Sequence, residues 1–150
     1  MQQASEHVKR FNYLSSEINS VYHEASLQMG LSDSASMILY AVCNHGGSCP
    51  LNDICRLSGL SKQTVNSSIR RLEADGYAFL EDSDGRKKTL FLTDKGKLLS
   101  QNTVVHLIRI ENEIFESWSE IEINQYFELT KKYLISFSEK LKQLSMEKTL

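Results

Sequence analysis

The segment from Ser61 to Arg70 concentrates side chains that form directional hydrogen bonds: SKQTVNSSIR. On a helix that turns by about 100° per residue, its apolar side chains share one side with the later Leu72. The opposite side and its N-terminal end carry amide, hydroxyl and cationic groups: Lys62, Gln63, Asn66, Ser67 and Arg70. An amide can bind adenine through two hydrogen bonds, and Arg or Lys can bind the two acceptors of guanine. This face has the chemistry to contact DNA, and the alternative is an ordinary solvent-facing amphipathic helix.

The charge distribution separates two parts of the chain, although the net charge is only −2. Between Arg56 and Arg71 there are four basic residues and no acidic one, and between Arg86 and Lys97 there are five basic residues against Asp94. By contrast, the stretch 111–128 holds six glutamates and no Lys or Arg. A polyanion is therefore attracted to the middle of the chain and repelled from its later part. Solvated helix faces remain the alternative interpretation.

Two short helices are predicted to hold the polar face. Pro50 suits the first turn of a helix over Leu51–Ser58, because its missing N–H is not needed there. Gly59-Leu60 makes a tight turn, and Ser61 is a good N-cap for a helix that extends to about Asp75. Two helices joined by a glycine-containing turn form a helix-turn-helix unit, with the polar face on its second helix.

The pattern changes after Gly76 to a predicted β-hairpin. Two short aromatic and β-branched runs, 77–81 and 89–92, flank a charged loop. Such a basic loop after a helix-turn-helix is the wing of a winged helix, and Arg86 can enter a minor groove beside it. Asp84 can orient that guanidinium through a charge-assisted pair, or Asp84-Gly85 can serve only as hairpin-turn chemistry.

Longer helices are predicted on both sides of this unit. All glycines fall between residues 30 and 96, and the outer stretches show apolar residues at helical spacing. We expect helices over about 5–29, from Ser32 to a turn at 44–47, from Thr93 to about Glu116, and over about 119–144. The predicted fold class is mainly α with a small β-hairpin wing, an α+β winged helix-turn-helix with long terminal helices.

The stretch from Gly30 to Lys97 resembles the MarR family of bacterial winged-helix regulators. The matching motifs are GLS at 30–32, GLSKQTV at 59–65, IRRLEADGY at 69–77, DGR at 84–86 and LTDKG at 92–96. The resemblance implies a single MarR-type domain over 1–150, with dimerisation helices at 5–29 and 94–145 and a DNA-binding lobe at 32–93. DNA contacts are implied for Ser61, Lys62, Gln63, Thr64, Asn66, Ser67 and Arg70, and wing contacts for Arg86 and Lys87, with Asp84 beside them.

The resemblance further implies the partners of the protein. We expect a homodimer on a palindromic operator, with its two recognition helices in successive major grooves about 34 Å apart. The function implied is a transcriptional regulator, most simply a repressor, modulated by a small-molecule effector. Tyr13, Tyr22, Tyr40 and Trp118 are aromatic candidates for an effector pocket, although such residues are more often core, and the sequence does not identify the effector.

Composition excludes several other classes. The chain of 150 residues is 41% hydrophobic, which is enough to fill a core. Its longest apolar run, Met37 to Cys43, is far shorter than the roughly 20 residues of a membrane span. The N-terminus has no apolar stretch typical of a secretory signal, and three cysteines favour a reducing cytoplasm. With no glycine-rich phosphate loop, HExxH or GxSxG motif, we expect neither an enzyme nor a cofactor.

The cysteines and histidines leave alternatives open. Cys43, His45, Cys49 and Cys55 lie close together in sequence but lack a CxxC pair, so a zinc site is not expected. A redox-sensing thiol at Cys43 or Cys49 is one alternative function. His23 and His106 are weaker metal or ligand candidates. A winged helix used only for protein contacts is another alternative, but it predicts an acidic or apolar face where the sequence has a basic, amide-rich one.

Overall fold

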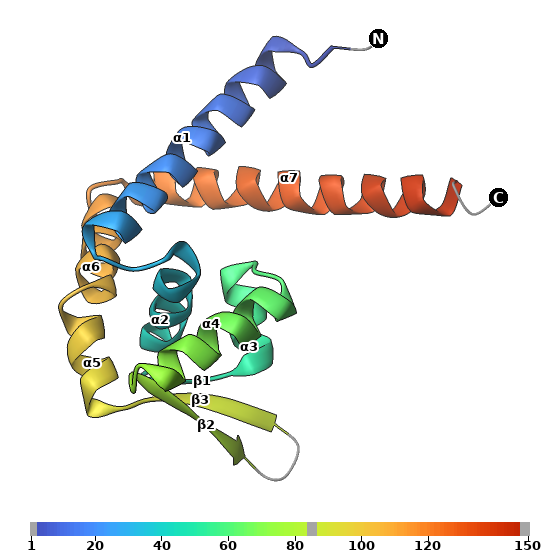
Figure 1. Cartoon of the computed structure of the whole chain (residues 1–150). Coiled ribbons are helices and arrows are strands. Elements are labelled where there is room, and N and C mark those ends of the chain that lie inside the picture. Colours follow the sequence, from blue (N-terminus) through green and yellow to red (C-terminus); the bar gives the residue numbers. More distant parts are fainter. Residues whose placement is uncertain (1–2, 84–86, 148–150) are drawn as a thin grey trace. The chain divides into compact units, whose positions relative to one another are not determined.

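The computed structural model describes residues 3–83 and 87–147, in two compact units (Figure 1). The first unit spans Met1–Ile108 and the second spans Arg109–Leu150. The elements are α1 (Glu6–Gln28), α2 (Asp33–Asn44), β1 (Ser48–Pro50), α3 (Leu51–Ser58), α4 (Lys62–Ala74), β2 (Ala78–Ser83), β3 (Lys87–Leu92), α5 (Asp94–Gln101), α6 (Val104–Glu116) and α7 (Glu120–Glu147). The predicted fold class is confirmed: the described residues form a mainly helical chain with a small antiparallel sheet.

The core of the first unit lies where α2, α3 and α4 pack together over the small sheet (Figure 1). The apolar side predicted for the second helix of the helix-turn-helix is buried, since Val65, Ile69 and Leu72 are all core residues. They meet Ile38 and Leu39 of α2 in the same cluster. Burying one side of α4 fixes its rotation, so the polar side must face outward.

The predicted helix ends are confirmed at their caps. The hydroxyls of Ser32, Ser61 and Thr93 accept hydrogen bonds from backbone N–H groups at the starts of α2, α4 and α5. Each hydroxyl satisfies one of the N–H groups that a helix leaves free in its first turn. At the end of α3, Gly59 adopts a positive φ of 66°, which a side chain would disfavour.

The sheet contains a strand that the sequence interpretation missed. The predicted hairpin forms β2 and β3, but β3 also pairs with β1, so that the strand order is β1-β3-β2. The register joins Cys49 to Leu90 on one side and Leu80 to Leu90 on the other. Because β1 is only three residues long, it carries no period-two signal and depends on pairing with a distant strand.

The single helix predicted from Thr93 to about Glu116 is wrong, because the structure breaks it into α5 and α6. Asn102 forms the C-cap of α5, and the Thr103 hydroxyl donates to the Leu99 carbonyl oxygen at 2.6 Å. This hydroxyl replaces a backbone donor at the end of α5, while the next residue, Val104, is completely buried. The break allows the Val104 side chain to point into the core. The apolar residues keep their helical spacing across the break, so the spacing in the sequence did not indicate it.

The second unit is a helical hairpin formed by the end of α6 and by α7. Phe115, Trp118, Tyr126 and Phe127 pack their rings together around the turn, with centroids 5.2–6.3 Å apart. At the turn, both the backbone N–H and the hydroxyl of Ser119 donate to the Glu122 carboxylate, and the Glu122 N–H donates to the Ser119 hydroxyl. This reciprocal arrangement is a capping box that begins α7.

Both long terminal helices expose apolar side chains. On α1 the exposed residues include Val8, Phe11, Leu14, Ile18 and Val21. On α7 they include Leu129, Leu134, Phe137, Leu141 and Leu144. These stripes match the apolar spacing seen in the sequence, but the described residues of each unit do not bury them. Within the described ranges, none of the helices is apolar over a length that would cross a membrane.

Candidate nucleic-acid interface

The helix-turn-helix consists of α3, a three-residue turn and α4. The Gly59 N–H donates to the Cys55 carbonyl oxygen, and the Leu60 N–H donates to the Ser58 hydroxyl, so that the turn is closed by local bonds. Ile54 on α3 is buried in the same core cluster as Val65 on α4. This packing fixes α4 against the rest of the first unit.

The outward side of α4 carries the side chains predicted to contact DNA. The exposed members are Ser61, Lys62, Gln63, Asn66, Ser67 and Arg70, and Thr64 is half-buried. Lys62 and Arg70 form no ion pair with another described residue. The structure therefore places six of the predicted residues on α4 and the seventh, Ser61, at its N-cap, and the two cations have no carboxylate partner among the described residues.

Some hydroxyl groups on this side already have local partners. The Ser61 Oγ accepts from the Thr64 N–H at 3.1 Å and lies 2.8 Å from the Thr64 Oγ1. The Ser67 hydroxyl donates to the Thr64 carbonyl oxygen at 3.0 Å. Each of these oxygens still has acceptor capacity, but Ser61 has a structural role as the N-cap. Gln63, Asn66 and Arg70 are the predicted residues with the most freedom to contact a base.

The N-terminus of α4 is electrostatically different from those of most other helices. Its cap is a neutral serine, and its first turn contains no acidic residue. By contrast, α1, α2, α3, α5 and α7 each carry Asp or Glu in the first turn. The partial positive charge of the helix N-terminus is therefore left uncompensated in α4, and Lys62 adds to it. This end of α4 attracts anions such as phosphate.

The predicted wing is the hairpin of β2 and β3. Asp84 and Arg86 lie outside the described residues, and Lys87 is described only through its backbone, which pairs with Ser83. At the next position, Lys88 is exposed opposite Asp82. The wing contacts predicted for Asp84, Arg86 and Lys87 thus remain predictions.

A cleft beside α4 was not predicted from the sequence. It has a volume of about 740 Å³ and lies between the link from α1 to α2, the start of α2, one side of α4, and α5. It is lined by Met29, Gly30, Leu31, Ser32, Ser34, Ala35, Thr64, Ser67, Ser68, Arg71, Leu72, Asp75, Tyr77 and Leu99. Its walls come from segments distant in sequence, so the only sequence signal was the run of hydroxyl residues on α4.

The aromatic residues proposed for an effector pocket do not line this cleft. Tyr40 packs against the core, Tyr13 is exposed on α1, and Trp118 belongs to the aromatic cluster of the second unit. Tyr22 is exposed on α1, where its carbonyl oxygen accepts a hydrogen bond from the Ser26 hydroxyl. Tyr77, a tyrosine that does line the cleft, was not among the predicted residues.

Cys43 and Cys49 both have raised thiol pKa values. Burial and the nearby Asp53 carboxylate raise the pKa of Cys49 to about 11. Burial also raises the pKa of Cys43, which the Ser100 hydroxyl lowers in part. Because the thiolate is the reactive form, these pKa shifts disfavour the redox-sensing alternative at Cys43 or Cys49. Cys55 is half-buried and packs against the core.

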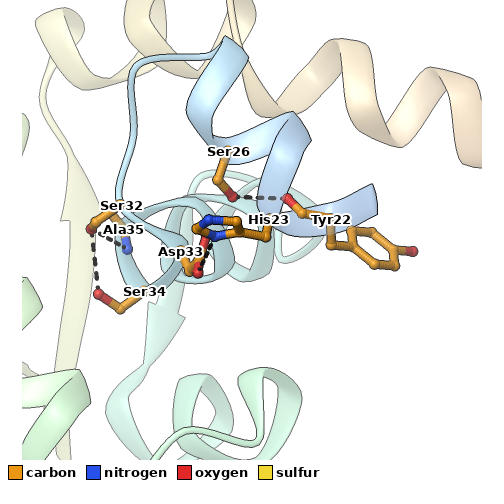
Figure 2. Close-up of polar contacts among 7 residues, drawn as sticks. All are labelled: Tyr22, His23, Ser26, Ser32, Asp33, Ser34 and Ala35. Atoms are coloured by element: carbon orange, nitrogen blue, oxygen red, sulfur yellow. Dashed lines mark hydrogen bonds and ion pairs between the residues drawn. The ribbon is translucent and has the colours of Figure 1, made fainter. Parts of the chain in front are cut away.

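His23 pairs α1 with the start of α2 (Figure 2). Its Nδ1 lies 2.8 Å and 3.0 Å from the two carboxylate oxygens of Asp33. Figure 2 also shows Ser32 capping Ala35 at the same end of α2. His106 is exposed on α6. Within the described residues, no three His, Cys, Asp or Glu side chains come together as a metal site.

The sequence of this chain was compared with models of known protein families. Residues 29–88 match the model of the MarR family, which confirms the predicted resemblance over the helix-turn-helix and most of the hairpin. No curated protein matches the chain in sequence.

Several solved protein structures share the fold. NMB1585, a MarR family regulator from Neisseria meningitidis, has 18% identity and a TM-score of 0.81, covering 93% of this chain and 99% of its own. BpsR from Bordetella bronchiseptica, whose DNA binding is regulated by 6-hydroxynicotinic acid, has 21% identity and a TM-score of 0.61 over 83% and 98%. PcaV from Streptomyces coelicolor, solved with its natural ligand, has 19% identity and a TM-score of 0.61 over 89% and 97%.

Proposed function

We propose that this chain, whose residues 29–88 match the MarR family, is a DNA-binding transcriptional regulator. The observation that carries the proposal is the exposed face of α4 on the helix-turn-helix. It holds amide and hydroxyl groups and two cations that have no ion-pair partner among the described residues. These groups match the donors and acceptors of base pairs in the major groove. The proposed base contacts are Gln63, Asn66 and Arg70, with Lys62, Thr64 and Ser67 at phosphate or sugar. Ser61 is proposed to orient the helix N-terminus toward a phosphate.

We further propose that the protein binds a palindromic operator as a homodimer. The support is the apolar side chains that α1 and α7 leave exposed, because monomeric proteins rarely expose long contiguous apolar stripes. In the proposed dimer, residues 5–29 and 94–145 form the subunit interface and residues 32–93 form the DNA-binding lobe. Two-fold symmetry then places two copies of α4 on two half-sites.

Modulation by a small molecule is the third part of the proposal, with repression as the most direct outcome of operator binding. It is supported by two of the proteins that share the fold, BpsR and PcaV, which are described with 6-hydroxynicotinic acid and with a natural ligand. A regulator of this kind acts without catalysis, in the compartment that holds the DNA. The effector shifts a population between conformations or blocks the DNA face, and in either case it must prefer the DNA-free protein.

The experiment that tests the proposal is binding of the purified protein to DNA from upstream of its own gene and to a genomic fragment library. Affinity is measured against random competitor DNA over a range of salt concentrations. We expect competitor-resistant binding that falls steeply with salt, because Lys and Arg contacts release counterions from phosphates. Footprinting then defines the operator.

One alternative function is a winged helix that binds protein only. It predicts that no genomic fragment is bound more tightly than random DNA. The salt-dependent, fragment-specific binding expected here would exclude that alternative. Equal binding to all fragments would instead contradict the proposed sequence-specific regulator.

A further inference from the structure

The cleft beside α4 is lined by apolar, hydroxyl and charged residues. Leu31, Leu72 and Leu99 supply apolar surface, and residues with hydroxyl groups from α2 and α4 also line the cleft. One of these hydroxyl pairs already joins the two helices, because the Ser68 hydroxyl donates to the Ser34 Oγ at 2.7 Å. A volume of about 740 Å³ is within the range of small-molecule sites, roughly 300–1,000 Å³.

The two charged residues are Arg71 on α4 and Asp75, the C-cap of α4, which lie four positions apart and both line the cleft. Neither forms an ion pair with another described residue. Arg N-terminal to Asp at this spacing is also the less favourable order for an ion pair within a helix. The neighbouring Lys95 is engaged elsewhere, since its Nζ donates to the Asp75 carbonyl oxygen at 2.8 Å and lies over the Tyr77 ring.

An unpaired cation next to an unpaired anion is complementary to a ligand that carries both charges. A plain carboxylate would pair with Arg71 but would meet the repulsion of Asp75, and a plain amine would meet the opposite conflict. A zwitterion satisfies both groups with charge-assisted hydrogen bonds. The three leucines that line the cleft then favour an apolar substituent on that zwitterion.

We propose that the cleft between α2 and α4 binds a free α-amino acid with an apolar side chain. The carboxylate of the amino acid pairs with Arg71, its ammonium group pairs with Asp75, and its side chain lies against Leu31, Leu72 and Leu99. This inference rests on the proposed function in one respect: the amino acid is an effector only if the protein is a regulator. The site itself is argued from the cleft and its two charges.

The cleft gives such a ligand a direct route to the DNA face. Thr64 and Ser67 line the cleft and also belong to the residues proposed to contact DNA. A ligand that engages these side chains or shifts α4 against α2 changes the DNA face without any signal passing through the rest of the molecule. We therefore expect ligand binding and operator binding to oppose each other, with reciprocal effects on the two affinities.

The test is isothermal titration of the full-length protein with L-leucine, L-methionine and L-phenylalanine. The matched analogues are 4-methylpentanoate, which lacks the ammonium group of leucine, and 3-methylbutylamine, which lacks its carboxylate. We expect saturable binding of at least one amino acid. Removing either charge of the ligand, or changing Arg71→Gln or Asp75→Asn, should weaken binding by about tenfold or more, the effect of losing one charged hydrogen bond.

Control variants separate the outcomes. Asp82→Asn removes an exposed carboxylate outside the cleft and should leave ligand binding unchanged. Circular dichroism establishes that each variant is folded. Failure of all three amino acids to bind, or equal binding of 4-methylpentanoate and leucine, would overturn the proposed site.

Operator binding is measured separately with and without the amino acid, so the two proposals fail independently. If the protein binds an amino acid but no DNA, the result supports the cleft site and contradicts the proposed regulator function. If it binds an operator but no amino acid, the result supports the regulator function and contradicts the cleft site.

Discussion

Arg70 is an exposed cation of the proposed DNA face, without a carboxylate partner among the described residues. If it binds the two acceptors of a guanine, Arg70→Ala should weaken operator binding by on the order of 1–3 kcal/mol and relax selectivity at one base pair. Fluorescence anisotropy with operator variants measures both effects. Arg56→Ala serves as the matched control, because it removes an exposed arginine that is paired with Asp53 and is not among the proposed contacts. Wild-type affinity of Arg70→Ala would exclude this contact.

Gly96 provides the second residue-scale prediction. A Cβ at this position would collide with the backbone carbonyl of Tyr77, which is held in place because its oxygen accepts from the Thr93 N–H. Since backbone cannot move aside as a side chain can, Gly96→Ala should lower the free energy of unfolding by on the order of 1–3 kcal/mol. Chemical denaturation measures the loss. The adjacent Lys97→Ala, at an exposed position, should leave stability nearly unchanged, and equal stability of the two variants would contradict the prediction.

At the scale of the element, the start of α7 depends on the capping box of Ser119 and Glu122. Ser119→Ala removes the cap and should lower stability by about 1 kcal/mol. The pKa of Glu122 is lowered from its ordinary value of 4.5 by hydrogen bonds from the Ser119 backbone and hydroxyl. A lowered pKa means that the carboxylate stabilises the folded state above pH 4.5 and loses this effect as the pH falls through the lowered value.

The pH dependence is checked by thermal unfolding of wild type and Glu122→Gln. Their difference in melting temperature should shrink as the pH falls below 4.5, because Glu122 then becomes neutral as well. A difference that stays constant down to acid pH would show that the carboxylate charge has no role in the cap. Glu128→Gln, a change at an exposed position further along α7, controls for general charge effects.

Elements were predictable from the sequence where their signals are local. Ser32, Ser61 and Thr93 act as caps within three residues of their partners, and the outward face of α4 follows from helical spacing alone. The β1 strand, the break before Val104 and the cleft depend on contacts between distant segments. No local pattern encodes the pairing of Cys49 with Leu90 or the approach of α2 to α4. The wing residues Asp84 and Arg86 rest on the sequence only.

At the scale of the whole molecule, the exposed stripe on α1 leads to a prediction about assembly. Ile18 is 53% exposed in the single chain, and in the proposed dimer it is buried once in each subunit. Ile18→Glu should therefore shift the protein from dimer to monomer, at a cost of roughly 1.5–3 kcal/mol per buried side chain. Analytical ultracentrifugation measures the mass, and anisotropy measures the accompanying loss of operator affinity.

Ser20→Glu is the matched control for this change. It introduces the same charge two positions further along α1, which is nearly the opposite side of the helix. We expect Ser20→Glu to remain dimeric. A wild type that is monomeric at micromolar concentration, or an Ile18→Glu variant that stays dimeric, would contradict the proposed role of this stripe.

The neutral cap of α4 implies a trade-off between stability and function. Aspartate caps a helix as well as serine and would also balance the positive end of α4, so Ser61→Asp should keep or raise the melting temperature. The same carboxylate would repel the phosphate proposed to lie at this end, and operator affinity should fall about tenfold or more in anisotropy measurements. A sequence optimised only for folding would therefore carry Asp at position 61. Serine at this position leaves the positive N-terminal end of α4 without a neutralising carboxylate. A phosphate from DNA could supply the missing negative charge at this end.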